Sequence, residues 1–135
     1  MVYLCFDFGT KSWGCAVGDS LSQTARALSA VKAIDGDPNW DMIDQHIHDW
    51  HPDSIVMGYP LKLDGERFKL TDLVDDAINE LTSRYPHLSV IKADERLSTV
   101  TAKAELFSQG GKKALEKGRI DSESARIILQ DWFES

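Results

Sequence analysis

The order of its apolar segments constrains the fold of this chain more than any other feature. Short apolar runs at residues 2–8, 54–58 and 89–94 have the length and composition of buried strands. Amphipathic helical patterns occupy the intervals at about 40–50 and 70–81. Strands that alternate with helices pair in parallel at the centre of a sheet, because each helix returns the chain to the start of the next strand. The segment order therefore predicts an α/β fold.

Two further strands precede the first helix. Residues 13–18 follow the first strand after a turn at Gly9, which predicts a hairpin, and residues 25–32 favour a third strand. Beyond the strand at 89–94, the pattern predicts a helix from about Thr99 and a last helix with apolar positions Ala125, Ile128, Leu129, Trp132 and Phe133. The expected order is β-β-β-α-β-α-β-α-α, which gives a mixed five-stranded sheet with helices on both faces.

The size and composition of the chain limit what it can be. With 135 residues, 42% of them hydrophobic, it can build one core, so we expect a single domain over residues 1–135. No apolar run approaches the roughly 18 residues that cross a bilayer, and Met1 leads directly into a strand. We therefore expect a cytoplasmic protein with no membrane contact. Cys5 and Cys15 lie in adjacent predicted strands and could face each other, but a reducing compartment favours two small buried side chains over a disulfide.

The distribution of charge matters more than its sum. A net charge of −7 disfavours a nucleic-acid partner, because phosphate would repel the molecule as a whole. Six aspartates and no lysine or arginine lie from Asp35 to Asp53. Residues 96–119, by contrast, carry Arg96, Lys103, Lys112, Lys113, Lys117 and Arg119 against two glutamates. This basic stretch permits a polyanionic substrate, although a solvated surface fits it as well.

Two of the predicted strands end in acids. Asp7 follows an apolar run, and Asp94-Glu95 follows another. A carboxylate at the end of a buried strand loses hydration, so it needs a cation or hydrogen-bond donors in place of the water. The carboxyl ends of parallel strands share one edge of the sheet, and Asp121 at the expected start of the last helix could join that edge. Such a group of carboxylates suits a divalent cation that acts on phosphate esters.

Four motifs follow one another along almost the whole chain. They are Asp7-Phe8-Gly9-Thr10-Lys11-Ser12, Gly58-Tyr59-Pro60-Leu61, Asp94-Glu95-Arg96-Leu97-Ser98-Thr99 and Asp121-Ser122-Glu123-Ser124-Ala125. Their order and spacing resemble the YqgF/RuvX-type family, which has the ribonuclease H-like fold. The resemblance implies a nuclease that acts on precursor 16S ribosomal RNA during ribosome biogenesis. It also implies an acidic triad of Asp7, Glu95 and Asp121 that holds one or two Mg²⁺ or Mn²⁺ ions.

The chain departs from its relatives at three positions. Holliday junction resolvases of this fold generally carry a fourth carboxylate three residues after the last acid, where this chain has Ser124. Tyr59 and Trp13 stand where smaller aliphatic side chains are expected, which would alter the shape of the crevice. A resolvase-like DNA endonuclease and a noncatalytic RNA-binding assembly factor remain alternatives to the rRNA nuclease.

Each acid also has a purely structural interpretation. Asp7 could hydrogen-bond the turn that follows it, and Asp121 could cap the last helix. Neighbouring strand residues face opposite ways, so only one of Asp94 and Glu95 can look into the site. The resemblance selects Glu95.

Basic and hydroxyl side chains near the acids are candidates for phosphate contacts. They are Lys11, Arg96, Ser98, Thr99, Lys112, Lys113, Lys117 and Arg119. Ser98 and Thr99 could instead cap a helix, and the last four could belong to a solvated glycine-containing loop. We expect structured RNA rather than a DNA junction as partner, and a ribosomal or other protein partner stays open.

Two other interpretations fit the sequence less well. His46, His48 and His51 do not share one face of a helix, which disfavours a zinc site. The turn after Asp7 is also similar to the phosphate-binding hairpin of the sugar-kinase and actin superfamily. Those proteins bind ATP between two lobes, and 135 residues supply one. Detectable ATP binding would revive that interpretation.

Overall fold

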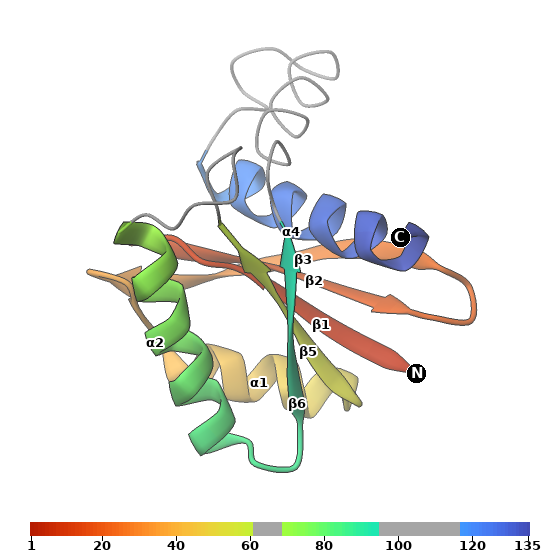
Figure 1. The fold of residues 1–135 in the computed structure, drawn as a ribbon, viewed down its shortest axis with the longest axis horizontal. Helices are drawn as coiled ribbons and strands as arrows, with labels where there is room; N and C mark the ends of the chain where they lie inside the picture. The colour runs from red at the N-terminus through yellow and green to blue at the C-terminus, as the bar shows by residue number, and fades with distance from the viewer. Residues whose placement is uncertain (61–68, 95–116) are drawn as a thin grey trace.

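The computed structural model describes residues 1–60, 69–94 and 117–135, with side chains described from residue 122 onward in the last stretch (Figure 1). The strands are β1 (Val2–Asp7), β2 (Ser12–Asp19), β3 (Thr24–Ile34), β4 (Asp37–Pro38), β5 (Ser54–Tyr59) and β6 (Ser89–Asp94). The helices are α1 (Trp40–Trp50), α2 (Lys69–Arg84) and α4 (Lys117–Glu134). None of these helices combines the length and the apolar character that crossing a membrane requires.

The described strands form one sheet in the order β4-β3-β2-β1-β5-β6. β1 pairs with β2, and β2 with β3, in antiparallel fashion, whereas β5 runs parallel to both β1 and β6. The antiparallel edge and the parallel centre predicted from the sequence are therefore both present.

The sheet has six strands where the sequence predicted five, because β4 adds a two-residue edge. It pairs with the end of β3 across the Asp35-Gly36 turn, in which φ is 51° and 87°. Two consecutive residues with positive φ are typical of the tight hairpin turn that an Asp-Gly pair favours. A strand of two residues is too short to show a periodic pattern, so periodicity alone does not predict it.

Helices cover both faces of the sheet, with α4 on one face and α1 and α2 on the other (Figure 1). Side chains of β1 alternate between the two layers. Tyr3 and Cys5 belong to the apolar cluster that includes Leu129 of α4, whereas Leu4 and Phe6 belong to the cluster with helices α1 and α2. The same alternation assigns residues of the other strands to the α4 face or to the opposite face, except across the register shift between β2 and β3.

The two cysteines lie on opposite faces and do not face each other. Cys5 packs in the cluster under α4, and Cys15 packs in the cluster under α1 and α2. Both are buried free thiols. The alternative in which they meet across adjacent strands is therefore wrong, because Cys5 pairs with Ala16 rather than with Cys15.

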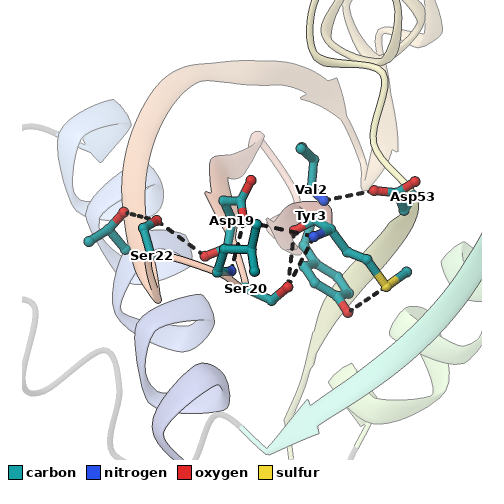
Figure 2. A network of polar contacts seen from close by, with 9 residues as sticks. Val2, Tyr3, Asp19, Ser20, Ser22 and Asp53 are labelled. Carbon is teal, nitrogen blue, oxygen red and sulfur yellow. Dashed lines mark hydrogen bonds and ion pairs between the residues drawn. The ribbon is translucent and has the colours of Figure 1, made fainter.

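The start of β1 is fixed by a polar network at the end of the sheet away from Asp7 (Figure 2). The backbone N–H of Val2 donates to Oδ2 of Asp53 at 2.8 Å, and the N–H of Asp53 donates back to the Val2 carbonyl at 2.8 Å. The terminal ammonium of Met1 donates to the Ser20 hydroxyl at 3.1 Å. These contacts fix the register of the central strand.

The last helix begins earlier than the sequence suggested. Its backbone is helical from Lys117, so Lys117 and Arg119 lie in the helix rather than in a loop, and Asp121 lies one turn inside it rather than opening or capping it. Gly118 made the segment resemble a loop, since glycine costs about 1 kcal/mol in a helix interior. Packing of the apolar face of α4 against β2 and β3 outweighs that cost. The helix predicted from Thr99 lies outside the described residues.

Candidate active site at the carboxyl edge of the sheet

Asp7 is the last residue of β1, the strand at the centre of the sheet. It follows Tyr3 and Cys5 at two-residue spacing, so its side chain belongs to the α4 face. Asp7 is half-buried, unlike the four fully or nearly fully buried residues that precede it. The carboxylate therefore stands where the apolar layer beneath α4 ends.

Glycines occupy the neighbouring positions on both adjacent strands. Asp7 is paired with Gly14 of β2. On the other side Phe6 is paired with Met57, so the next residue of β5 beside Asp7 is Gly58. A glycine within a strand marks a bulge or a place where a ligand or another backbone approaches closely, and the pairing of β2 with β3 shifts at Gly14. The residues beside Asp7 on the two adjacent strands therefore carry no side chain.

The turn after Asp7 carries Lys11 to the same edge. A Cβ atom on Gly9 would lie 2.2 Å from the carbonyl oxygen of Ser12, so the tight turn requires glycine. The N–H of Ala33 donates to the Lys11 carbonyl at 2.9 Å and ties this turn to β3. Lys11 is exposed, which is what a phosphate contact requires.

Asp94 ends β6, and alternation separates it from Asp7. Ala93 lies in the α4-side cluster, whereas Val90 packs into the opposite one. Lys92 lies two residues before Asp94 and therefore on the same face of β6. Its Nζ atom is 3.6 Å from Oδ1 of Asp75 on α2. Glu95 lies outside the described residues.

Asp94 also borders a hollow of about 200 Å³ at the open edge of the sheet, together with Asp131 and Trp132 of α4. Burial raises the pKa of the Asp131 carboxyl, and the nearby Glu134 raises it further, while Arg126 partly offsets the shift. Asp7 is not among the residues that line this hollow.

The direction of α4 brings the backbone of Asp121 towards Asp7. The rings of Trp132 and Phe133 contact Tyr3 near the start of β1, with centroids 4.9 and 5.8 Å away. Because α4 runs against β1, its first residues lie towards the end of that strand (Figure 1). The backbone course is thus compatible with a site shared by Asp7 and Asp121.

The other residues predicted for the site are described incompletely or not at all. Outside the described ranges lie Glu95, Arg96, Ser98, Thr99, Lys112 and Lys113. Lys117, Arg119 and Asp121 have a described backbone in α4, while their side chains are not described. Among the described residues no three histidine, cysteine or acidic side chains form a group that could hold a metal ion, and of the proposed triad only Asp7 has a described side chain.

Trp13 and Tyr59 do not shape the crevice around Asp7, contrary to the sequence-based expectation. Trp13 is fully buried in the cluster beneath α1 and α2, and Tyr59 packs against that cluster. Both therefore lie on the face opposite Asp7. Adjacent motif residues alternate between faces, so a motif position alone does not place a side chain in the site.

The histidines of α1 lie on that opposite face too. Nε2 of His46 is 3.0 Å from the carbonyl oxygen of Ser29, and the rings of His48 and His51 have centroids 6.0 Å apart. The sequence analysis assigned no role to Gly14 or Gly58, although Gly58 begins one of the four motifs. Only the strand register shows that they flank Asp7.

Comparisons with known proteins agree on a family. The model of the RuvX family, described as Holliday junction resolvase, matches residues 1–135. A protein of Actinobacillus pleuropneumoniae named "Putative pre-16S rRNA nuclease" is 50% identical over 132 residues, covering 98% of this chain and 96% of its own length. One of the same name from Glaesserella parasuis is 51% identical over 131 residues, covering 97% and 94%.

Two solved structures share the fold. A RuvC of T. thermophilus in complex with a Holliday junction substrate has a TM-score of 0.57 at 16% identity, covering 99% of this chain and 94% of its own. A Fowlpox virus resolvase in complex with Holliday junction DNA has a TM-score of 0.58 at 14% identity, covering 100% of both chains. They confirm the mixed α/β, ribonuclease H-like fold. The family match and the two relatives that are half identical show that the chain belongs to the RuvX family.

Proposed function

We propose that this protein is a metal-dependent nuclease of one domain that hydrolyses phosphodiester bonds in precursor 16S rRNA in the cytoplasm. The observation that carries the proposal is the position of Asp7 at the carboxyl end of the central strand, with Gly14 and Gly58 on either side. Ligands of α/β folds gather at such strand ends. The relatives that are half identical to this chain, and named for pre-16S rRNA, support the choice of substrate.

Asp7, Glu95 and Asp121 are proposed to hold Mg²⁺ or Mn²⁺. Carboxylate oxygens are the ligands that these hard cations prefer, and a half-buried carboxylate at a strand end fits that chemistry. When bound, the cation supplies a water of lowered pKa and neutralises negative charge on the phosphate. The chain contributes the fixed direction of the Asp7 carboxylate, which the paired strands β1 and β2 provide.

The choice of Glu95 over Asp94 rests on the family resemblance and on the face that Asp94 occupies. Ala93 lies on the face of Asp7, whereas Asp94 alternates with it and shares the face of Lys92, which lies by α2. We therefore keep Glu95 as the proposed second acid.

The proposed contacts to the substrate are basic and hydroxyl side chains around this edge. Lys11 is exposed on the turn next to Asp7 and is suited to hold a phosphate near the scissile bond. We further propose phosphate contacts for Arg96, Ser98, Thr99, Lys112, Lys113, Lys117 and Arg119. A lysine or arginine beside a metal site binds and orients the substrate strand without taking part in proton transfer.

A second candidate is a Holliday junction resolvase. The description of the family and the fold shared with two junction-bound resolvases favour it. Against it, the position of the fourth resolvase carboxylate is Ser124, which is 1% exposed on the face of α4 that packs on the sheet. We therefore place the RNA substrate first.

Cleavage of two substrates tests the proposal. End-labelled precursor 16S RNA and a four-way DNA junction are each incubated with the purified protein in Mg²⁺, Mn²⁺ or EDTA. We expect metal-dependent cleavage of the RNA and no cleavage in EDTA. Cleavage of the junction alone would replace the RNA substrate with DNA. Cleavage that persists in EDTA would contradict the metal mechanism, and inactivity of the folded protein on both substrates would favour a noncatalytic assembly factor.

A further inference from the structure

We propose that Lys32 belongs to the nucleic-acid interface, where its ammonium binds a backbone phosphate that neighbours the scissile one. This inference rests on the proposed function, because that function brings a nucleic-acid strand past Asp7. It adds a residue from β3, a part of the chain outside the motifs of the family. The face, the position and the charge of Lys32 all suit such a contact.

Lys32 lies on the same face of the sheet as Asp7. Its neighbour Val31 is fully buried in the cluster beneath α1 and α2, and Ala33 packs against that cluster. Since strand residues alternate, the side chain of Lys32 projects on the α4 face. Lys32 is exposed there.

The strand register places Lys32 close to the proposed site. Lys32 is paired with Ser12, and Ser12 stands two residues before Gly14, the partner of Asp7. With strands about 4.8 Å apart and a rise of about 3.4 Å per residue, the Cα atoms of Lys32 and Asp7 lie about 12 Å apart. A strand that crosses the carboxyl edge at Asp7 therefore passes within reach of the long Lys32 side chain.

Backbone hydrogen bonds hold Lys32 and Lys11 in one rigid frame. The N–H of Asn39 donates to the Lys32 carbonyl at 2.7 Å, and the N–H of Ala33 donates to the Lys11 carbonyl at 2.9 Å. Both lysines line a surface hollow of about 510 Å³. The backbone positions of the two lysines are thus fixed relative to each other, and both side chains border the same hollow.

The charge of this hollow suits phosphate, although the whole molecule carries −7. Asp37 also lines it, and Oδ1 of Asp37 accepts a hydrogen bond from Nε1 of Trp40 at 3.2 Å. Within the described part of the chain, neither Lys11 nor Lys32 has an ion-pair partner among the salt bridges found. In the lining of this hollow two lysines outnumber one aspartate, which favours contact with a phosphate.

Salt-dependent binding tests the role of Lys32. The probe is a fluorescent 30-nucleotide single-stranded RNA, titrated at several salt concentrations in EDTA so that no metal-dependent cleavage occurs. For Lys32→Ala we expect about threefold to tenfold weaker binding, and a slope of log K against log salt that is less steep by about 0.7, the value for one lost phosphate contact. A four-way DNA junction is titrated in parallel, to show whether the contact is shared by DNA.

Lys92→Ala is the matched control. Lys92 is also an exposed strand lysine, but it lies on the opposite face with its Nζ atom 3.6 Å from Asp75. We expect its removal to leave the affinity and the slope unchanged. Thermal melting of each variant shows that the fold is retained, and Lys32→Arg should keep binding because it keeps the charge.

The outcomes separate this inference from the proposed function. A slope for Lys32→Ala equal to that of the parent, or a loss no greater than for Lys92→Ala, would overturn the Lys32 contact even if metal-dependent RNA cleavage is observed. The protein could also cleave neither RNA nor DNA while the Lys32→Ala variant shows a less steep dependence of log K on log salt. That result would support the contact and contradict the nuclease. Absence of binding to both probes by the parent would overturn the contact.

Discussion

Asp7 stands directly opposite Gly14 in the antiparallel pair of β1 and β2, so the carboxylate at the end of β1 faces a residue without a side chain. On the other side of β1 the register continues to Gly58. The apolar layer under α4 is thus interrupted at the row that contains Asp7. Under the proposed function, a phosphate ester approaches Asp7 at this interruption.

Filling the space beside Asp7 should impair catalysis. We expect Gly14→Val to cleave precursor RNA at least about tenfold more slowly, because its side chain would stand next to the carboxylate where the substrate approaches. Valine is well suited to a strand, so the pairing of β1 and β2 should persist. Steady-state cleavage and thermal melting measure the two effects separately. Cleavage at the parent rate would show that no ligand approaches at Gly14.

Gly18→Ala supplies a comparison on the same strand and face, far from Asp7. A Cβ atom there would lie 2.7 Å from both Cε2 of Phe133 and the carbonyl oxygen of Thr24. We expect a loss of about 1–3 kcal/mol in the free energy of unfolding, as in other overpacked cores. The folded fraction should retain the cleavage rate of the parent. Denaturant unfolding and cleavage at low temperature test both parts.

The adjacent acids at the end of β6 should differ in their effects. We expect Glu95→Gln to lower the cleavage rate by about 100-fold, because a metal-binding carboxylate is lost. Asp94→Asn should stay within about threefold of the parent, because alternation places Asp94 with Lys92 on the other face. Single-turnover rates at saturating Mg²⁺ measure the difference. The reverse order of effects would show that Asp94 is the acid in the site.

The Cys15 thiol should be unreactive in the folded protein. Burial raises its pKa well above the ordinary thiol range, so the reactive thiolate is scarce at pH 8. In a Cys5→Ala background we expect reaction with a thiol-specific reagent to be at least about 100-fold slower in the native state than in guanidinium. Equal rates would show that Cys15 is accessible.

The same shift makes stability depend on pH. Because the folded-state pKa of Cys15 is raised, this group favours the folded state below the ordinary thiol range. That contribution is lost as the pH rises through the range, where the unfolded chain ionises and the folded chain does not. Cys15→Ala should reduce the fall in melting temperature at alkaline pH, which melting curves across that range measure.

The sequence was sufficient for the central sheet but not for the contacts between its strands. Periodicity identified the segments that became β1, β5 and β6, because buried parallel strands are continuous apolar runs. It missed β4, which has two residues, and it began α4 too late, because Gly118 resembles a loop residue. A one-dimensional pattern carries no information on packing that compensates for a weak helix former.

The candidate site was predictable only in part for a related reason. Asp7 stands out in sequence as an acid after an apolar run, and the structure places it at the carboxyl edge. Trp13 was expected to shape the crevice but is buried on the other face. The glycines beside Asp7 and the position of Lys32 depend on strand register, which joins residues far apart in the chain.

The most direct test of the account is the single-turnover cleavage rate of Asp7→Asn against the parent on precursor 16S RNA with Mg²⁺. The amide keeps the size of the side chain and removes its charge, so melting temperature should change little while metal binding is weakened. The account predicts a rate at least about 100-fold lower, with RNA binding in EDTA retained. A folded Asp7→Asn protein that cleaves at the parent rate would contradict it.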